Sequence, residues 1–485
     1  MALKLTVLSI YALTIIVFGL IGASKTRSFS DFLLGGGKVG PWMSAFSYGT
    51  AYFSAVIFIG FAGNVGWNFG YSGIWVGFFN AIVGVFLVWK LLAWKVKQAS
   101  LKYGVYTMSE FLEARYDAKY FKLLASFVIF IFLIPYSAAV FQGLSYLFES
   151  SLPGLQYWHA VLFMGFFTAL YLSMGGYKSM ASLDTFFGII MVVGVILMTV
   201  FTISRADGLG NITAKLNEFN PKLTAVVGPP GWWPLFSLVF LTSVAPFAMP
   251  QLIQKFLSIR DEKAIKVGTI ASTVFALLIG CVAYFVGSTG RFFINAENTP
   301  GVFENGKPLF DRLMPELLMN IIPDSIFVII LVLLLSASMS TLAALVLISS
   351  STLSKDFYQG YINKNVSDEK LTLITRVASV VFVSLSVALA LFRIDTIVAI
   401  LGISWGAIGS AFLGPFIWGI LGNKANKYGA YASFFAGLGT SLVLYFNSMP
   451  SPQAGTIGML VSLAVNPTVS IVFKQKGVKH EEKSD

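Results

Sequence analysis

Side chains and carbonyls that carry oxygen gather in a strongly apolar stretch near residue 340. The run from Ser336 to Ala344 reads Ser-Ala-Ser-Met-Ser-Thr-Leu-Ala-Ala. In a helix, residues 337, 340 and 341 share one face, because they are spaced i, i+3 and i+4. That face presents the backbone carbonyl of Ala337 and the hydroxyls of Ser340 and Thr341. Neutral oxygens of this kind suit a hard monovalent cation, so the pattern indicates a candidate cation site.

The same hydroxyls also have a common structural use. Ser and Thr in membrane helices usually donate to carbonyls of their own helix or join two helices. If this face meets a break in the second apolar segment, the carbonyls of Thr50 and Phe53 would complete a shell of five oxygens. The residues alone leave both interpretations open.

The elements that must position these residues are membrane helices. Of 485 residues, 56% are hydrophobic and 11% are charged, whereas soluble domains are ~25% charged. Apolar runs long enough to cross a bilayer recur along the chain. We therefore expect an all-α polytopic membrane protein with about 13 transmembrane helices embedded in the lipid bilayer.

Two common classes of enzyme are excluded by the rarity of reactive side chains. Cys281 is the single cysteine, and His159 and His480 are the two histidines. A disulfide framework, a cysteine zinc site and a soluble Ser-His-Asp or zinc enzyme are therefore not expected. No G-x-x-x-x-G-K-[ST] loop for a nucleotide is present, so we expect no enzymatic activity.

The basic residues are distributed unevenly between alternate loops. One set of loops holds 23 Lys and Arg residues, and the other holds eight. Cytoplasmic loops carry the excess of positive charge, which predicts an external N-terminus and a cytoplasmic C-terminus in a multi-pass plasma-membrane protein, with a bacterial or archaeal source. The net charge of +11 thus follows from topology, and we expect no nucleic-acid partner.

Two of the expected helices contain residues that interrupt a helix in mid-membrane. Residues 47–55 read Ser-Tyr-Gly-Thr-Ala-Tyr-Phe-Ser-Ala, and residues 242–251 include Pro246 and Pro250. Each proline removes a backbone donor and disrupts the preceding turn. Kinked helices that pack through small residues are the simpler interpretation.

The position of the two interrupted helices suggests a repeat. They are the second and seventh spans, five apart, as in transporters built from two inverted repeats whose first helices are broken around substrate and ion. We therefore expect a first repeat over residues 41–205 (spans 2–6) and a second over 206–422 (spans 7–11). An N-terminal helix and cytoplasmic loop (1–40) would precede them, and helices 12–13 with a cytoplasmic tail (423–485) would follow.

A longer set of motifs resembles one known family. Met339 to Leu342, followed by Ser349 to Tyr358, resembles the signature of the sodium:solute symporter family, whose members carry proline, sugars, sialic acid, pantothenate and monocarboxylates. Further matches, in family order, are Ser30 to Gly36, Ser47 to Gly63, Gly175-Gly176 with Asp184-Thr185, Pro250 with Phe256, and Ser404 to Gly406 through Gly414-Pro415.

The resemblance implies a fold and an ion site. The fold is a LeuT-type core of 5+5 inverted repeats with one extra N-terminal helix. A co-transported sodium ion would be bound by the carbonyls of Thr50, Phe53 and Ala337 and the hydroxyls of Ser340 and Thr341.

The resemblance also bears on Asp184, which matches a family acidic residue near the cytoplasmic exit. In some members this residue helps to bind a second sodium ion, although a carboxylate at a helix end can instead cap the helix. The second-sodium pattern uses two further hydroxyls, and Ala343 and Ala344 occupy those positions here. We therefore assign Asp184 to gating or ion exit and expect one sodium per transport cycle.

The expected substrate cavity contains no charged side chain. Its expected lining is Tyr52, Ser54, Tyr136, Gln142, Thr242, Phe247 and Gln251. Such walls suit a small solute of limited net charge, or a carboxylate that faces a half-helix N-terminus and the sodium ion. Proline-carrying members have Asp in place of Tyr52, and Trp and Tyr in place of Thr242 and Pro246, which weakens a proline specificity.

The main hypothesis is a sodium-coupled symporter that imports a monocarboxylate or an amino acid such as proline, for which a monomer is sufficient. A proton-coupled transporter of the same fold, with Asp184 as the proton carrier, is an alternative. Sugar, sialic acid or pantothenate symport is another. A membrane sensor or channel on the same scaffold is the alternative outside transport, and the chain lacks a signalling domain to support it.

Overall fold

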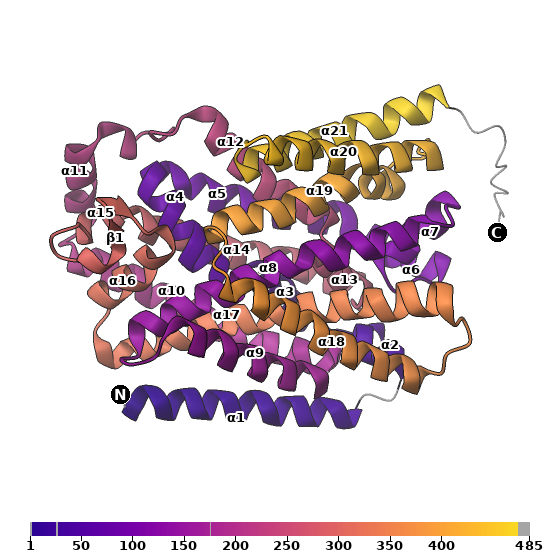
Figure 1. Ribbon diagram of the computed structural model, residues 1–485, viewed down its shortest axis with the longest axis horizontal. Coiled ribbons are helices and arrows are strands. Elements are labelled where there is room, and N and C mark those ends of the chain that lie inside the picture. Colours follow the sequence, from indigo (N-terminus) through magenta and orange to yellow (C-terminus); the bar gives the residue numbers. More distant parts are fainter. Residues whose placement is uncertain (1, 26–27, 175, 474–485) are drawn as a thin grey trace.

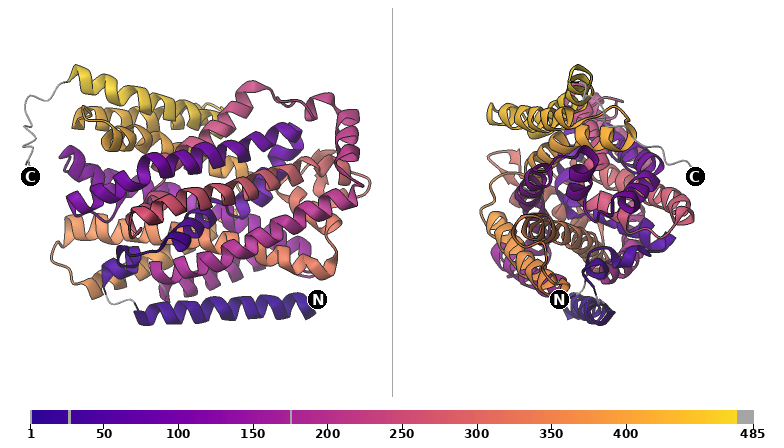
Figure 2. Two further views of the ribbon diagram at one scale, coloured as in Figure 1. Left: turned by 180° about the vertical axis from the view of Figure 1, so that it is seen from behind. Right: turned by 90° about the vertical axis from the view of Figure 1, so that its right-hand side faces the viewer.

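The computed structural model describes residues 2–25, 28–174 and 176–473 and shows a bundle of nearly parallel helices (Figure 1, Figure 2). Residue 175 and the basic tail after Phe473, which we expect in the cytoplasm, lie outside the described residues.

The helices of the first half of the chain alternate long spans with short connecting helices. They are α1 (Ala2–Lys25), α2 (Phe29–Leu34), α3 (Pro41–Tyr52), α4 (Ala62–Phe69), α5 (Ile74–Phe79), α6 (Trp94–Tyr103), α7 (Met108–Tyr116), α8 (Phe121–Ser151), α9 (Tyr157–Met174), α10 (Tyr177–Arg205) and α11 (Leu209–Phe219). Tighter or wider helical turns occupy Gly35–Gly37, Val56–Phe61, Gly70–Gly73, Asn80–Leu87, Trp89–Ala93 and Pro221–Leu223.

The second half adds one small hairpin at an end of the bundle. Its helices are α12 (Trp232–Val244), α13 (Pro250–Leu257), α14 (Glu262–Ser288), α15 (Gly290–Phe293), α16 (Phe310–Ile321), α17 (Asp324–Ser351), α18 (Asp368–Leu391), α19 (Ile397–Leu421), α20 (Lys427–Phe446) and α21 (Ser451–Val472). Further helical turns occupy Ala245–Ala248, Pro300–Val302 and Thr352–Ile362, and β1 (Phe303–Glu304) pairs antiparallel with β2 (Lys307–Pro308).

Ten helical segments of the described chain are long and apolar enough to cross a membrane, or 11 when the bent α12–α13 pair counts as one span. The expected number of about 13 stays a prediction. Two expected spans are merged, because the chain stays helical and apolar from Val56 to Tyr103. Another expected span corresponds to α9, whose described apolar part, Tyr157–Leu170, is shorter than a full crossing.

Local sequence signals explain where several helices begin. Ser28 accepts a hydrogen bond from the backbone N–H of Asp31, and the Asp31 carboxylate accepts one from the N–H of Ser28, which forms a capping box at α2. Asp261 accepts from the N–H of Ala264 at 2.8 Å and caps α14. Pro41 occupies the first turn of α3, where its missing N–H costs no helical hydrogen bond.

Both predicted helix breaks are present. Helix α3 ends at Tyr52, Phe53 has extended backbone angles, and helical structure resumes after Ser54. Helix α12 ends at Val244, and Met249 is extended before α13 begins at Pro250, with a bend of 42°. The residue before a proline is driven out of the helical region, which accounts for Met249.

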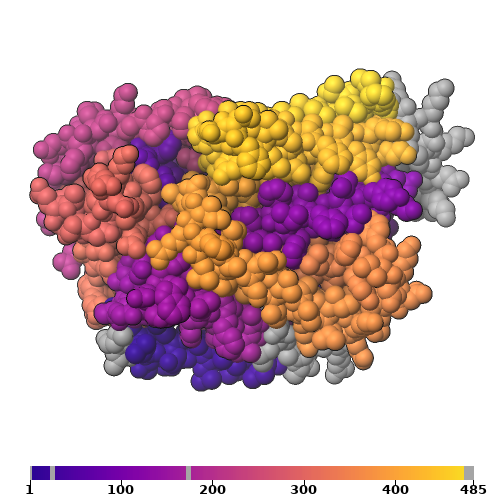
Figure 3. All heavy atoms as spheres, viewed as in Figure 1, coloured from indigo at the N-terminus to yellow at the C-terminus, as the bar shows by residue number. Residues whose placement is uncertain are grey.

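Helix α17 forms the centre of the bundle, with 89% of its span window buried. It packs against α10, α18 and α3. Helix α1 lies on the outside, with 17% of its window buried, and α20 and α21 form a ridge along the opposite edge (Figure 3). Helices α11, α15 and α16 and the hairpin gather at one end of the bundle, and α2, α6 and α7 at the other (Figure 1).

Glycines allow α4 and α5, the helices that follow the break in α3, to pack closely on α14. Gly77 of α5 and Gly280 of α14 face each other directly, so that a Cβ on Gly77 would overlap the Gly280 backbone. Gly66 of α4 meets Gly287 of α14 in the same way. Such contacts between small residues let membrane helices approach closely, and here they hold the segment beyond the break in place.

Candidate functional site

Side-chain hydroxyls support the backbone where α3 is broken. The Ser338 hydroxyl accepts a hydrogen bond from the backbone N–H of Ala55 at 3.2 Å, and the Ser54 hydroxyl accepts from the N–H of Val56 at 3.2 Å. In a membrane the backbone groups released by a break must find partners within the protein. The break is therefore a built feature that α17 stabilises.

The predicted oxygen-bearing face of α17 meets α3 just before this break. Ser340 donates to the Thr50 hydroxyl at 2.8 Å. The Thr341 hydroxyl lies 3.3, 3.2 and 3.1 Å from the carbonyl oxygens of Thr50, Ala51 and Ala337. We call these five residues the oxygen cluster, and all of them are buried. Four of the five predicted sodium ligands thus lie together.

The fifth predicted ligand, Phe53, lies at the break itself and is fully buried. The hydrogen bonds of the described residues connect Ala51, and not Phe53, to Thr341. The carbonyl of Ala51 is an oxygen that sequence reasoning missed, because the direction of a carbonyl in the last turn of a broken helix depends on the tertiary structure.

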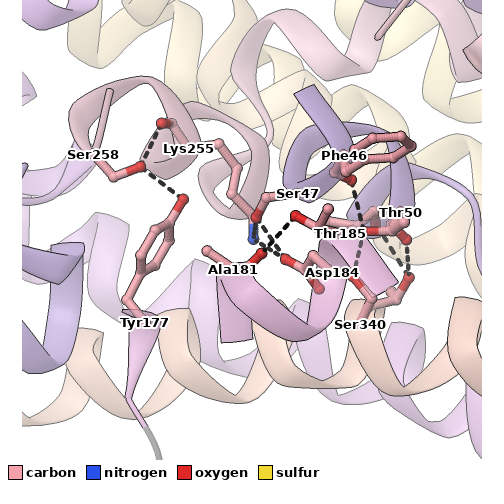
Figure 4. A network of polar contacts seen from close by, with 12 residues as sticks. Phe46, Ser47, Thr50, Tyr177, Ala181, Asp184, Thr185, Lys255, Ser258 and Ser340 are labelled. Carbon is pink, nitrogen blue, oxygen red and sulfur yellow. Dashed lines mark hydrogen bonds and ion pairs between the residues drawn. The ribbon is translucent and has the colours of Figure 1, made fainter. Parts of the chain in front are cut away.

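A buried ion pair lies beside the oxygen cluster (Figure 4). The ammonium of Lys255 on α13 lies 3.4 Å from Oδ2 of Asp184 on α10, and both groups contact the hydroxyl of Ser47 on α3, which donates to Asp184 at 2.6 Å. Ser47 and Thr50 are three residues apart on α3 and therefore share one face. The ion pair and the oxygen cluster are thus neighbours on the same helix.

Asp184 is not a helix cap. Helix α10 begins at Tyr177, so Asp184 lies about two turns inside the helix and fully buried. The role of Asp184 in gating or ion exit stays a prediction. The sequence did not indicate its partner Lys255, because no sequence spacing relates a residue of α10 to a residue of α13.

A small cavity of about 20 Å³, enough for about one water molecule, lies beside the break. Four of its lining residues were predicted: Tyr52, Ser54, Tyr136 and Thr242. The others are Val56, Ile57, Phe61, Asn80, Tyr284, Leu401 and Trp405. The lining residues that the structure describes include no Lys, Arg, Asp or Glu.

Hydrogen bonds and ring contacts fix the walls of the cavity. The Tyr52 hydroxyl donates to the Thr242 carbonyl at 2.6 Å. Asn80 Oδ1 accepts from the hydroxyls of Thr242 and Ser243 at 2.8 and 2.9 Å. The Tyr52 and Trp405 rings stack with their centroids 5.9 Å apart. The two broken helices, α3 and α12, are thereby joined at the cavity.

Three predicted lining residues lie outside this cavity. Gln142 of α8 donates to Asp311 and to the Asp395 carbonyl, each at 3.0 Å, toward the end of the bundle that holds α16. Phe247 belongs to the turn between α12 and α13, and Gln251 is buried in the first turn of α13. The sequence pattern does not show how far along its helix each of these residues lies from the cavity.

Asp311 links three elements at that end of the bundle. It lies on α16, accepts from Gln142 on α8, and accepts from the backbone N–H of Ile397, the first residue of α19, at 3.1 Å. Burial, together with the nearby negative charge of Asp395, raises the pKa of Asp311 to about 7, although these two hydrogen bonds oppose the rise. This carboxylate can therefore change its charge near neutral pH.

The cavity residues that sequence reasoning missed differ in their sequence signal. Trp405 lies in the Ser404 to Gly406 motif that matches the family, so the sequence could have indicated this residue. Asn80 and Tyr284 are isolated polar residues in apolar helices, and only the packing of those helices shows that they face a cavity.

Comparison with known proteins adds an independent line of support. The model of the sodium:solute symporter family matches residues 32–437. A sodium/pantothenate symporter of Haemophilus influenzae is 25% identical over 461 residues, covering 92% of each chain. A sodium/proline symporter of Staphylococcus aureus is 26% identical over 489 residues, covering 97% of this chain and 93% of the relative.

Solved structures show a similar fold. A Na⁺-coupled sialic acid symporter in a substrate-bound, outward-open state superimposes with a TM-score of 0.81 at 18% identity, covering 97% of this chain and 98% of that one. Mhp1, a nucleobase-cation-symport-1 family transporter, gives a TM-score of 0.54 at 12% identity, covering 93% and 96%. At these identities the likeness concerns the fold alone.

Proposed function

This chain belongs to the sodium:solute symporter family and is a sodium-coupled symporter, and on that premise we propose that its solute is a small monocarboxylate or an amino acid such as proline. It is a multi-pass membrane transporter, and its named relatives are symporters and not enzymes. We further propose that it works in the plasma membrane by alternating access, with sodium flow driving solute uptake.

The oxygen cluster is the proposed sodium site. One observation carries this proposal: the hydroxyl face of α17 meets the last turn of broken α3, so that Ser340 and Thr341 contact Thr50 directly. Carbonyl and hydroxyl oxygens converge there, and neutral oxygens of this kind suit a hard monovalent cation. Phe53 would join the shell if its carbonyl turns inward when sodium binds.

The cavity beside Tyr52 is the proposed solute site. Its uncharged polar and aromatic walls favour a solute of limited net charge. Pantothenate, proline and sialic acid, the solutes named for relatives and for a structural neighbour, each carry a carboxylate. Tyr52, Ser54, Tyr136 and Thr242 are the proposed contacts among the predicted residues.

We also propose a repeat arrangement, a sodium stoichiometry, a membrane orientation and an oligomeric state. The two breaks, in α3 and between α12 and α13, support inverted repeats over residues 41–205 and 206–422. Ala343 and Ala344 in place of hydroxyl residues support one sodium per cycle. The loop charges support an external N-terminus, and one chain holds both repeats, so a monomer is the proposed unit.

Uptake into proteoliposomes tests the proposal. An inward sodium gradient should drive accumulation of a labelled carboxylate or of L-proline, whereas an equal potassium or choline gradient should not. Ser340→Ala and Thr341→Ala should abolish this dependence. Uptake that follows a proton gradient instead, and that is lost on Asp184→Asn but kept in Ser340→Ala, would replace sodium coupling by proton coupling.

A further inference from the structure

An apolar cavity of about 300 Å³ lies between α1, α8, α9 and α17, and we call it the lateral cavity. Its walls are apolar apart from the hydroxyls of Ser9 and Tyr11, and the wall residues that the structure describes include no charged side chain. An engineered apolar cavity of ~150 Å³ stays free of water and binds benzene. The lateral cavity is therefore large enough to hold a segment of hydrocarbon chain.

The lateral cavity connects the outer surface of the bundle with its buried centre. Two of its wall residues, Leu5 and Phe163, are 48% and 64% exposed, whereas Met164 and Met339 are 2% and 0% exposed. Leu5 belongs to the apolar span of α1, and Phe163 belongs to the apolar part of α9. In a bilayer such surfaces face acyl chains. The medium that reaches the opening of the cavity is therefore lipid.

Polar and aromatic residues mark where the bilayer surface lies relative to the lateral cavity. Lys4 forms an ion pair with the exposed carboxylate of Asp324 at 2.5 Å, and Trp158 is 48% exposed. Lys and Trp at the ends of membrane helices are typical of the lipid–water interface. The wall residues of α1 lie within residues 5–12, directly after Lys4, and span about 10 Å of helix. A phospholipid with its headgroup at this surface can therefore place part of an acyl chain in the cavity.

The gain from filling the lateral cavity is a gain in packing. An acyl chain in the bilayer is already out of water, so the hydrophobic effect does not drive it into the protein. The walls of an empty cavity lack van der Waals partners on one side, and an entering chain supplies them. Met164 and Met339 have flexible, polarisable side chains that adapt to the shape of an occupant.

The lateral cavity also lies behind the helix that carries the oxygen cluster. Its wall residues Leu335 and Met339 are spaced i and i+4 on α17, on the face opposite that of Ala337 and Thr341. We propose that the lateral cavity is a binding site for one acyl chain of a membrane phospholipid, which packs between α1 and the back of α17.

Two substitutions fill the lateral cavity from different helices, and a third provides the control. Ala12→Phe on α1 and Ala160→Phe on α9 each place a phenyl ring in the wall. Ala464→Phe makes the same change at an exposed position of α21, which does not line the cavity. Helix α21 runs along the edge of the bundle opposite α1 (Figure 3).

Photolabelling of the full chain in phosphatidylcholine vesicles tests the proposal. The probe is a phosphatidylcholine with a diazirine in one acyl chain, and peptide mass spectrometry locates the label. Phe166 is 71% exposed and does not line the cavity, so it should be labelled by any surrounding lipid. Met164 and Met339 are buried and should be labelled as well, because the chain enters the cavity.

The filling variants should lower labelling of Met164 and Met339, relative to Phe166, about tenfold. Ala464→Phe should leave this ratio unchanged. Delipidated protein should also gain a smaller rise in Tm from added phosphatidylcholine in Ala12→Phe and Ala160→Phe than in the unsubstituted protein or Ala464→Phe.

Several results would overturn the proposal. Labelling of Phe166 without Met164 and Met339 in the unsubstituted protein would show that lipid contacts the outer surface alone. An unchanged labelling ratio in both filling variants would place the chain elsewhere. Labelling by a diazirine fatty acid but not by the phospholipid would assign the site to a free fatty acid, and cross-links between the α1 helices of two copies would assign it to a dimer contact. If one variant does not fold, the other variant and the unsubstituted protein decide.

Discussion

The ammonium of Lys255 lies 3.4 Å from Oδ2 of Asp184, with the two side chains 2% and 0% exposed. Figure 4 shows this pair in contact with Ser47 and close to Ser340 and Thr50. A buried ion pair of this kind contributes little net stability, but the loss of one partner leaves an uncompensated charge. The pair joins α10, α13 and α3, the three helices around the oxygen cluster.

Lys255→Met should therefore destabilise the protein strongly, by roughly 3–5 kcal/mol. The double variant Asp184→Asn with Lys255→Met removes both charges and should recover most of the loss, as measured by thermal unfolding in detergent. Lys266→Met is the control, because Lys266 forms an exposed pair with Glu262 and such pairs contribute about 0–1 kcal/mol. Equal melting temperatures for the single and double variants would contradict an electrostatic role for the pair.

Sodium should stabilise the protein through the oxygen cluster. At about ten times its Kd, a bound ion adds roughly 1.4 kcal/mol, so Tm should rise in NaCl above its value in KCl or choline chloride at equal ionic strength. Ser340→Ala and Thr341→Ala should remove this difference. Ser350→Ala should retain it, since Ser350 donates to Val346 and Leu347 carbonyls of its own helix. A shift that survives in both cluster variants would place the ion elsewhere.

Asp311 should make stability depend on pH. Its pKa is about 7 in the folded protein and about 3.9 in an unfolded chain, so the folded state holds a proton that the unfolded state has released between these values. The contribution of Asp311 to the free energy of unfolding should therefore be greatest below about pH 4. It should fall by on the order of 4 kcal/mol as the pH rises to about 7.

Asp311→Asn tests this dependence, because it removes the titrating group. Melting curves from pH 4 to 8 should be flatter for this variant than for the unsubstituted protein. Asp207→Asn, on an exposed turn, should leave the curve unchanged. Parallel curves for the Asp311 variant and the unsubstituted protein would show that other groups cause any dependence.

The glycine contact between α5 and α14 should not tolerate a side chain. Gly77→Ala places a methyl group against the Gly280 backbone, and overpacking of this kind typically costs about 1–3 kcal/mol. Gly439→Ala on α20 is the control, since no atom lies within 4 Å of its added Cβ, and it should leave Tm unchanged or raise it. Equal effects of the two substitutions would show that helix propensity, and not the contact, decides the result.

The sequence predicted the parts of the structure that depend on local chemistry. Pro246 and Pro250 indicated the break before α13, and the small and polar residues around Thr50 indicated the break after Tyr52. The spacing of Ser340 and Thr341 placed their hydroxyls on one face of α17, and the family resemblance indicated that this face meets α3.

The sequence did not predict the parts that depend on how helices are placed relative to one another. Lys255 pairs with Asp184 across two helices, and Tyr284 reaches the cavity from α14, without any regular spacing between the partners. Gln142 was predicted to line the solute site together with Tyr136, which lies on the same helix. Six residues of α-helix span about 9 Å, which places Gln142 beside Asp311.

The break after Tyr52 separates the proposed sodium site from the proposed solute site by only a few backbone atoms. Thr50 and Ala51 face the ion side, Ser54 lines the cavity, and Ser338 of α17 holds the N–H of Ala55. Any factor by which bound sodium raises solute affinity must equal the factor by which bound solute raises sodium affinity. On the proposed assignment of the two sites, this short stretch of unwound chain is the shared element through which that reciprocity would operate, and either ligand could report on the other.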